Sequence, residues 1–121
     1  PYSASKAMAE LAVRSYRESF KESMPALATA RAGNIIGGGD FSKYRLLPDC
    51  FKSLSKQEPI LIRSPSSVRP WLYVLDALFG YLLLGKKLTE QPNGYSDSFN
   101  FGPLEMKGVI RAFPGKQFVQ V

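Results

Sequence analysis

Tyr2 and Lys6 stand four positions apart at the start of a segment with helical periodicity. Side chains with this spacing share one face of a helix, so the Lys6 ammonium can lie beside the Tyr2 phenol. A neighbouring cation favours the phenolate form of a tyrosine, which can then take a proton from a hydroxyl group while hydride leaves the same carbon. The same spacing occurs by chance on many helices, so the pair is a candidate catalytic dyad that needs support from its context.

Length and composition limit the classes of protein to consider. At 121 residues, 45% of them hydrophobic, the sequence has enough apolar content for one small domain or for part of a larger one. The single cysteine, Cys50, allows no internal disulfide, and the absence of histidine removes the commonest metal ligand, so we expect no metal site. No apolar run reaches membrane-spanning length, and we expect a cytoplasmic protein without a membrane partner.

The formal net charge of +6 raises the alternative of nucleic-acid binding. The sixteen Lys and Arg residues are scattered, with Lys86 and Lys87 as the one adjacent pair, and no nucleic-acid-binding motif accompanies them. A basic surface serves phosphorylated small molecules equally well. We therefore expect no nucleic-acid partner.

Periodicity and breakers predict an α/β chain that would position the dyad on its first helix. The expected helices cover residues 3–22, a segment with Pro48 at its first position, and residues 74–85; the expected strands cover residues 27–31, 60–62 and 98–101. Residues 34–40 read as a glycine-rich loop. Such a loop is either a simple turn or a place where the backbone approaches a ligand, and it lacks the strand-to-helix context of a dinucleotide fingerprint.

Several separated motifs carry a resemblance to a known family. They comprise residues 1–6, 31–40, 45–49, 62–65, 68–71, 80–84 and 99–103. In this order they resemble the extended short-chain dehydrogenases/reductases of the NAD-dependent epimerase/dehydratase family, and within it the CDP-glucose 4,6-dehydratases. Tyr73, Leu75 and Asp76 are also similar to the dTDP-glucose branch, which leaves the nucleotide open.

The resemblance implies a fold and a domain organisation. Residues 1–103 would be the carboxyl-terminal half of such an enzyme, comprising part of a Rossmann-like parallel sheet and a small nucleotide-sugar-binding domain. Residues 104–121 do not resemble the family and would be a divergent tail. The glycine-rich pyrophosphate loop, the acidic ribose-binding residue and the third catalytic residue of the family precede the dyad and are not found in residues 1–121.

The resemblance also implies a role for each matched residue. Tyr2 would be the base that deprotonates the sugar C4 hydroxyl, and Lys6 would hold the nicotinamide ribose, so that both contact the cofactor. Asn34 and Arg69 would bind the substrate diphosphate, for which the paired donors of arginine are suited. The remaining contacts, to the base and ribose, would come from Arg45, Leu46 and Arg63. Trp71 and Asp76 would have structural roles.

The implied reaction is an internal redox cycle on CDP-glucose with NAD as cofactor. C4 is oxidised, water is eliminated across C5 and C6, and the hydride returns to C6, giving CDP-4-keto-6-deoxyglucose. A homodimer like that of the family is a further expectation. Alternatives are another extended short-chain dehydrogenase, such as a nucleotide-sugar epimerase or decarboxylase, an inactive fragment, or a piece that folds only with a partner.

Overall fold

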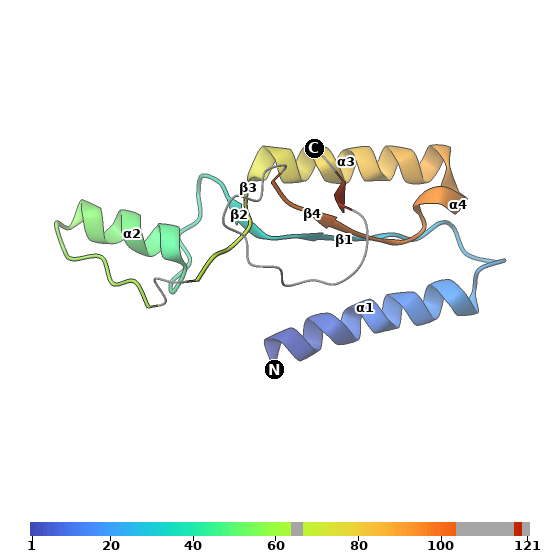
Figure 1. Cartoon of the computed structure of the whole chain (residues 1–121), viewed down its shortest axis with the longest axis horizontal. Helices are drawn as coiled ribbons and strands as arrows, with labels where there is room; N and C mark the ends of the chain where they lie inside the picture. Colours follow the sequence, from blue (N-terminus) through green and yellow to red (C-terminus); the bar gives the residue numbers. More distant parts are fainter. Residues whose placement is uncertain (64–66, 104–117, 120–121) are drawn as a thin grey trace.

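The computed structural model describes residues 1–63, 67–103 and 118–119 (Figure 1). Parallel strands with helices on both faces confirm the predicted α/β class and are consistent with part of a Rossmann-like domain. The elements in chain order are α1 (Tyr2–Ser19), β1 (Thr29–Ala32), β2 (Asn34–Ile36), α2 (Leu46–Ser55), β3 (Trp71–Tyr73), α3 (Val74–Glu90), α4 (Pro92–Tyr95), β4 (Ser98–Phe101) and β5 (Phe118–Val119).

Strand β4 lies at the centre of a three-stranded parallel sheet, between β1 and β5. Its register with β1 runs from Thr29 opposite Ser98 to Ala32 opposite Phe101. The predicted bounds of β4 are confirmed, whereas β1 lies slightly later in the chain than residues 27–31. The predicted tail enters the sheet through β5, and residues 104–117 of that tail lie outside the described residues.

The apolar face of this sheet is covered by α3 (Figure 1). Alternate residues of a strand point to opposite faces, and Phe99 and Phe101 are both 2% exposed on the face that meets the helix. They form one buried cluster with Leu72, Ala77 and Leu84. The ring of Tyr81 meets that of Phe101 edge to face at 5.1 Å between centroids. Apolar packing therefore fixes α3 on the sheet.

The opposite face of the sheet is polar and carries α1 (Figure 1). The carboxylate of Glu10 on α1 accepts hydrogen bonds from the hydroxyls of Thr29, at 2.9 Å, and Ser98, at 3.3 Å. Its oxygen also lies 3.4 Å from the guanidinium of Arg31. Two helical turns further along α1, Arg17 forms an ion pair with Asp97 at 3.4 Å. Polar side chains thus hold the helix that begins with Tyr2.

A second pair of parallel strands, β2 and β3, corrects the prediction of a loop over residues 34–40. Asn34–Ile36 forms β2, and the irregular segment begins only at Gly37. The glycines before and after β2 are explained by packing: a Cβ at Gly33 would clash with the carbonyl oxygen of Pro70, and one at Gly37 would lie 2.9 Å from a methyl of Val74. Two of the glycines in this stretch therefore serve close approach of the backbone.

Two helices differ from their predicted bounds for identifiable reasons. Helix α2 begins at Leu46, and Pro48 is its third residue; the first-turn N–H groups have no intrahelical acceptor, so proline is tolerated there. Helix α3 continues past residue 85 to Glu90, supported by ion pairs from Lys86 and Lys87 to Glu90 at 3.7 and 3.4 Å. Helix α1 ends slightly before the predicted residue 22. No helix of the described residues is long and apolar enough to cross a membrane.

The strand predicted at residues 60–62 is wrong. The described backbone there pairs with no other strand, and Leu61 is strongly exposed. The strand that pairs with β2 is β3 instead, where the sequence pattern predicted no strand. An apolar run of three residues has no structure of its own until another strand supplies hydrogen bonds.

The close approach of Gly33 to Pro70 predicts a strong and local effect of a single methyl group. Gly33→Ala should lower the free energy of unfolding by about 1–3 kcal/mol, because the new Cβ must displace a backbone carbonyl. Gly38→Ala is the matched control, since among the described residues no atom beyond its chain neighbours lies within 4 Å of a Cβ built there. Urea unfolding of both variants checks this, and equal stabilities would contradict the packing role of Gly33.

Candidate functional site

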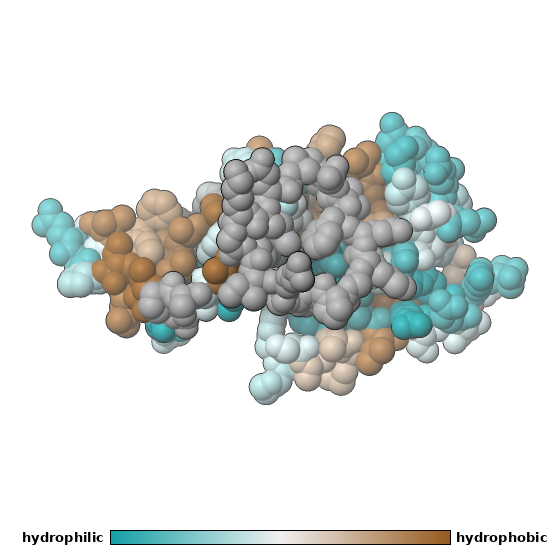
Figure 2. Space-filling view, viewed as in Figure 1, coloured by the Kyte–Doolittle hydropathy of each residue, from teal (hydrophilic) through white to brown (hydrophobic). Residues whose placement is uncertain are grey.

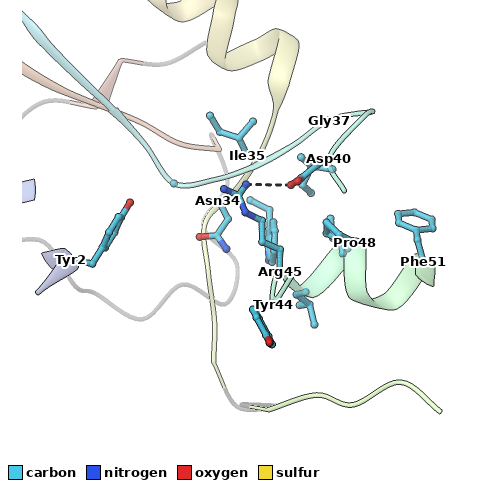
Figure 3. A pocket seen from close by; sticks show the side chains of 14 residues that line it. Tyr2, Asn34, Ile35, Gly37, Asp40, Tyr44, Arg45, Pro48 and Phe51 are labelled. Carbon is cyan, nitrogen blue, oxygen red and sulfur yellow. Dashed lines mark hydrogen bonds and ion pairs between the residues drawn. The ribbon is translucent and has the colours of Figure 1, made fainter. Parts of the chain in front are cut away.

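A cavity of about 510 Å³ is lined by residues of β2, α2 and the turn between them, by Trp71 of β3 and by Tyr2 of α1 (Figure 3). Tyr2 borders it from the start of α1, and Asn34 from the start of β2. The turn between β2 and α2 contributes Asp40, Tyr44 and Arg45. The cavity is therefore lined by residues from segments far apart in the sequence. Four of them are site residues that the sequence predicted: Tyr2, Asn34, Arg45 and Leu46.

The predicted dyad has the geometry expected from its spacing. The Lys6 ammonium lies 5.6 Å from the centroid of the Tyr2 ring, one helical turn away. Tyr2 is 75% exposed, and Figure 3 shows its ring at one side of the cavity. Lys6 itself is exposed and does not border the cavity. The phenol is thus accessible to a ligand in the cavity, with a cation beside it.

Asn34 offers its side chain, and not its backbone, to the cavity. Its N–H donates to the carbonyl oxygen of Pro70 at 2.9 Å, at the junction of β2 and β3. The side-chain amide lies between Tyr2 and Arg45 in the view of Figure 3. A diphosphate could therefore be bound by the amide N–H₂ group, while the backbone donor is already used.

A compact turn holds Arg45 at the cavity. Its guanidinium lies 3.2 Å from the Asp40 carboxylate, drawn as a dashed line in Figure 3. The other Asp40 oxygen accepts a hydrogen bond from the Ser42 N–H at 3.0 Å. The Ser42 hydrogen bonds, and to a smaller extent Arg45, hold the pKa of Asp40 below its ordinary value. Asp40 is consequently ionised near neutral pH and can orient Arg45.

The wall formed by α2 is apolar. Leu46, Pro48 and Phe51 border the cavity from the first half of this helix. Figure 2 shows hydrophobic side chains gathered at the α2 end of the molecule, where Phe51 and Leu54 are largely exposed. The cavity thus combines polar groups on one side with an apolar surface on the other, a common pattern in sites for small organic ligands.

Two predicted arginines lie outside the cavity lining. The Arg63 guanidinium donates to the carbonyl oxygen of Tyr44 at 2.6 Å and lies 5.7 Å from the centroid of its ring. Arg69 donates to the carbonyl oxygen of Val68 at 3.0 Å. Trp71, expected to be structural, borders the cavity and is partly buried. Sequence reasoning missed Tyr44 and gave no role to Asp40, although Asp40 follows the glycine run directly.

Comparison with known proteins supplies the wider context. Residues 1–102 match the model of the NAD dependent epimerase/dehydratase family. The chain is 42% identical over 109 residues to the CDP-glucose 4,6-dehydratase of Salmonella typhimurium, which covers 85% of this chain and 30% of that protein. It is 38% identical over 77 residues to the low-salt glycan biosynthesis protein Agl12 of Haloferax volcanii, covering 63% of this chain and 24% of that protein. The chain thus spans less than a third of these relatives.

The lowered pKa of Asp40 predicts how the turn responds to acid. A carboxyl whose pKa is depressed on folding stabilises the folded turn fully above its ordinary pKa of about 3.9, and this contribution is lost as the pH falls through the folded value. The Ser42 amide resonance should therefore titrate below pH 3.9 in an NMR experiment. Asp40→Asn should abolish the transition, and a midpoint at or above the ordinary value would contradict the assignment.

Proposed function

Because the chain belongs to the NAD dependent epimerase/dehydratase family, we propose that it supplies the nucleotide-sugar site and the Tyr2–Lys6 dyad of a 4,6-dehydratase that acts on CDP-glucose. The single observation that carries this proposal is the position of Tyr2. Its accessible phenol borders the same cavity as Asn34 and Arg45, with the Lys6 ammonium beside its ring. In this proposal a base and two phosphate-binding groups face one ligand, and the Lys6 ammonium lies beside the ring of that base.

In this proposal the polar side of the cavity binds the diphosphate. The Asn34 amide donates neutral hydrogen bonds. Arg45, which the resemblance assigned to the base and ribose, is proposed here as a second diphosphate ligand, because it borders the cavity beside Asn34 and its guanidinium has paired donors suited to phosphate oxygens. Asp40 keeps the Arg45 guanidinium in place, at 3.2 Å. Arg69 remains a proposed diphosphate ligand, which requires it to exchange its contact with the Val68 carbonyl for one with the substrate. The apolar wall around Leu46 would border the base and ribose, with Arg63 behind Tyr44.

The sugar would lie at the Tyr2 end of the cavity. Tyr2 removes the proton from the C4 hydroxyl, and the Lys6 ammonium lies 5.6 Å from the centroid of its ring. Further acid and base groups are needed for the elimination, and the motifs assign none among the described residues.

The dyad also fits the nicotinamide end of the cofactor. Lys6 carries three exposed N–H donors, and Tyr2 an exposed hydroxyl, which suit the hydroxyls of a ribose. When bound, NAD would accept and return the hydride. The pyrophosphate has no comparable partner among residues 1–63 and 67–103, because the glycine run at Gly37–Gly39 does not open a helix: α2 begins at Leu46.

A chimaera tests the proposed reaction. Residues 1–103 would replace the matching segment of the Salmonella enzyme, whose remaining sequence would supply the dinucleotide-binding part expected of the family. We expect conversion of CDP-glucose to a product lighter by one water, followed by mass spectrometry. Tyr2→Phe should reduce turnover by roughly 10²–10⁴-fold with little change in substrate affinity, because only proton transfer is lost.

Tyr16→Phe is the matched control, since it removes the same hydroxyl from the same helix away from the cavity. Its turnover should equal that of the unmodified chimaera. If Tyr2→Phe retained a third of the activity, Tyr2 would not be the base. If the active chimaera isomerised the sugar without losing water, the epimerase alternative would replace the dehydratase.

The 121-residue chain by itself should bind NAD poorly. A pyrophosphate is normally held by a glycine turn and the helix N-terminus that follows it, and the described residues contain no such arrangement. Calorimetric titration of the purified chain should show no saturable NAD binding. A dissociation constant in the micromolar range would mean that the cofactor is bound by a different set of residues.

A further inference from the structure

Tyr44 is a bulky residue in a backbone conformation that usually requires glycine. Its φ is 64°, within the left-handed region, which is unfavourable for a residue with a large side chain. Burial of the ring does not compensate for this, because Tyr44 is 77% exposed. Backbone strain of this kind persists only where surrounding contacts enforce it, and it concentrates at ligand-binding sites.

The contacts that enforce this conformation come from both sides of Tyr44. On one side, Arg63 donates to the Tyr44 carbonyl oxygen at 2.6 Å. On the other, Asp40 closes the turn by accepting from the Ser42 N–H and pairing with Arg45. The backbone on either side of Tyr44 is therefore tied down, while its ring remains open to solvent. The turn thus holds the backbone that carries this exposed aromatic ring.

The ring borders the cavity, and a cation lies over it. The Arg63 guanidinium is 5.7 Å from the ring centroid, and Tyr44 stands beside Arg45 in Figure 3, on the far side of Asn34 from Tyr2. Among the described residues the Tyr44 ring is paired with no other aromatic ring. A flat group in the cavity can thus stack on it.

We propose that the Tyr44 ring is the stacking platform for the nucleobase of the nucleotide sugar, with Arg63 as a positioning residue that holds it. This inference rests on the proposed function, in which the sugar lies at Tyr2 and the diphosphate at Asn34 and Arg45. The base must then lie beyond Arg45, where Tyr44 and the apolar start of α2 meet. Stacking on an aromatic ring is available to every base, so Tyr44 contributes affinity more than choice among bases.

The test measures binding to the 121-residue chain by NMR titration with three probes: CDP, inorganic pyrophosphate and glucose 1-phosphate. Tyr44→Gly removes the ring and suits the positive φ, so it should fold at least as well as the original chain. We expect it to weaken CDP binding about fivefold to a hundredfold, the usual effect of losing one aromatic–base stack. Affinity for the two probes without a base should not change.

Two control variants accompany this comparison. Tyr44→Phe should bind CDP within about twofold of the original chain, because it keeps the aromatic face. Tyr16→Ala, which removes an exposed tyrosine from α1 away from the cavity, should leave all three affinities unchanged.

Each other outcome has a definite meaning. Equal CDP affinity of Tyr44→Gly and the original chain would overturn the role of Tyr44 and leave the proposed function standing. Equal losses for CDP and pyrophosphate would show that the residue acts through the shape of the turn, and a loss for glucose 1-phosphate would place the sugar on the ring; both overturn the inference. If the original chain binds none of the probes, the proposed function fails and this inference fails with it.

Discussion

The two faces of the β1–β4 pair determine where α3 and α1 lie, and with α1 the position of Tyr2. In a parallel pair, residues in register point to the same face, so Thr29 and Ser98 share one face while Ala30 and Phe99 share the other. The apolar face binds α3 through buried aromatic and aliphatic side chains. The polar face receives α1 mainly through Glu10, whose carboxylate meets two hydroxyls and a guanidinium.

This polar attachment has consequences for Tyr2. Partly exposed ion pairs contribute at most about 1 kcal/mol each, and hydrogen bonds to a charged group somewhat more, so α1 is held less firmly than α3. The Arg17 contact adds little to this balance, since its Nη1 is buried without a hydrogen-bond partner among the described residues, while Nη2 meets Asp97. Because Tyr2 begins α1, its position at the cavity depends on these few directional contacts. The other cavity residues depend instead on the backbone junction at Gly33 and Pro70.

Local patterns predicted the parts of the fold whose signals are contained in one segment. The alternation of residues 98–101, the helical spacing of α1 and the first turns of α3 all needed no distant partner. The dyad geometry followed from helical spacing alone. By contrast, β2 and β3 are strands only because they pair with each other. The glycines around β2 favoured the prediction of a loop over residues 34–40, although Asn34–Ile36 forms a strand.

The candidate site, like the fold, could be predicted from the sequence only in part. Motif order identified Asn34, Arg45 and Leu46, which the fold brings to the cavity with Tyr2. It could not predict that Arg63 would meet Tyr44, because residues on either side of α2 are brought together only by the path of the chain. The positive φ of Tyr44 has no sequence signal either, since glycine and asparagine are the residues that normally indicate it.

The central claim is that one cavity binds a nucleotide sugar with its sugar towards α1 and its base towards the turn before α2. Intermolecular nuclear Overhauser effects between CDP-glucose and the tyrosine rings of the chain test this claim most directly. The account predicts cross-peaks from the glucose protons to the Tyr2 ring and from the cytosine protons to the Tyr44 ring. Cross-peaks from the glucose protons to Tyr44, with none to Tyr2, would contradict it.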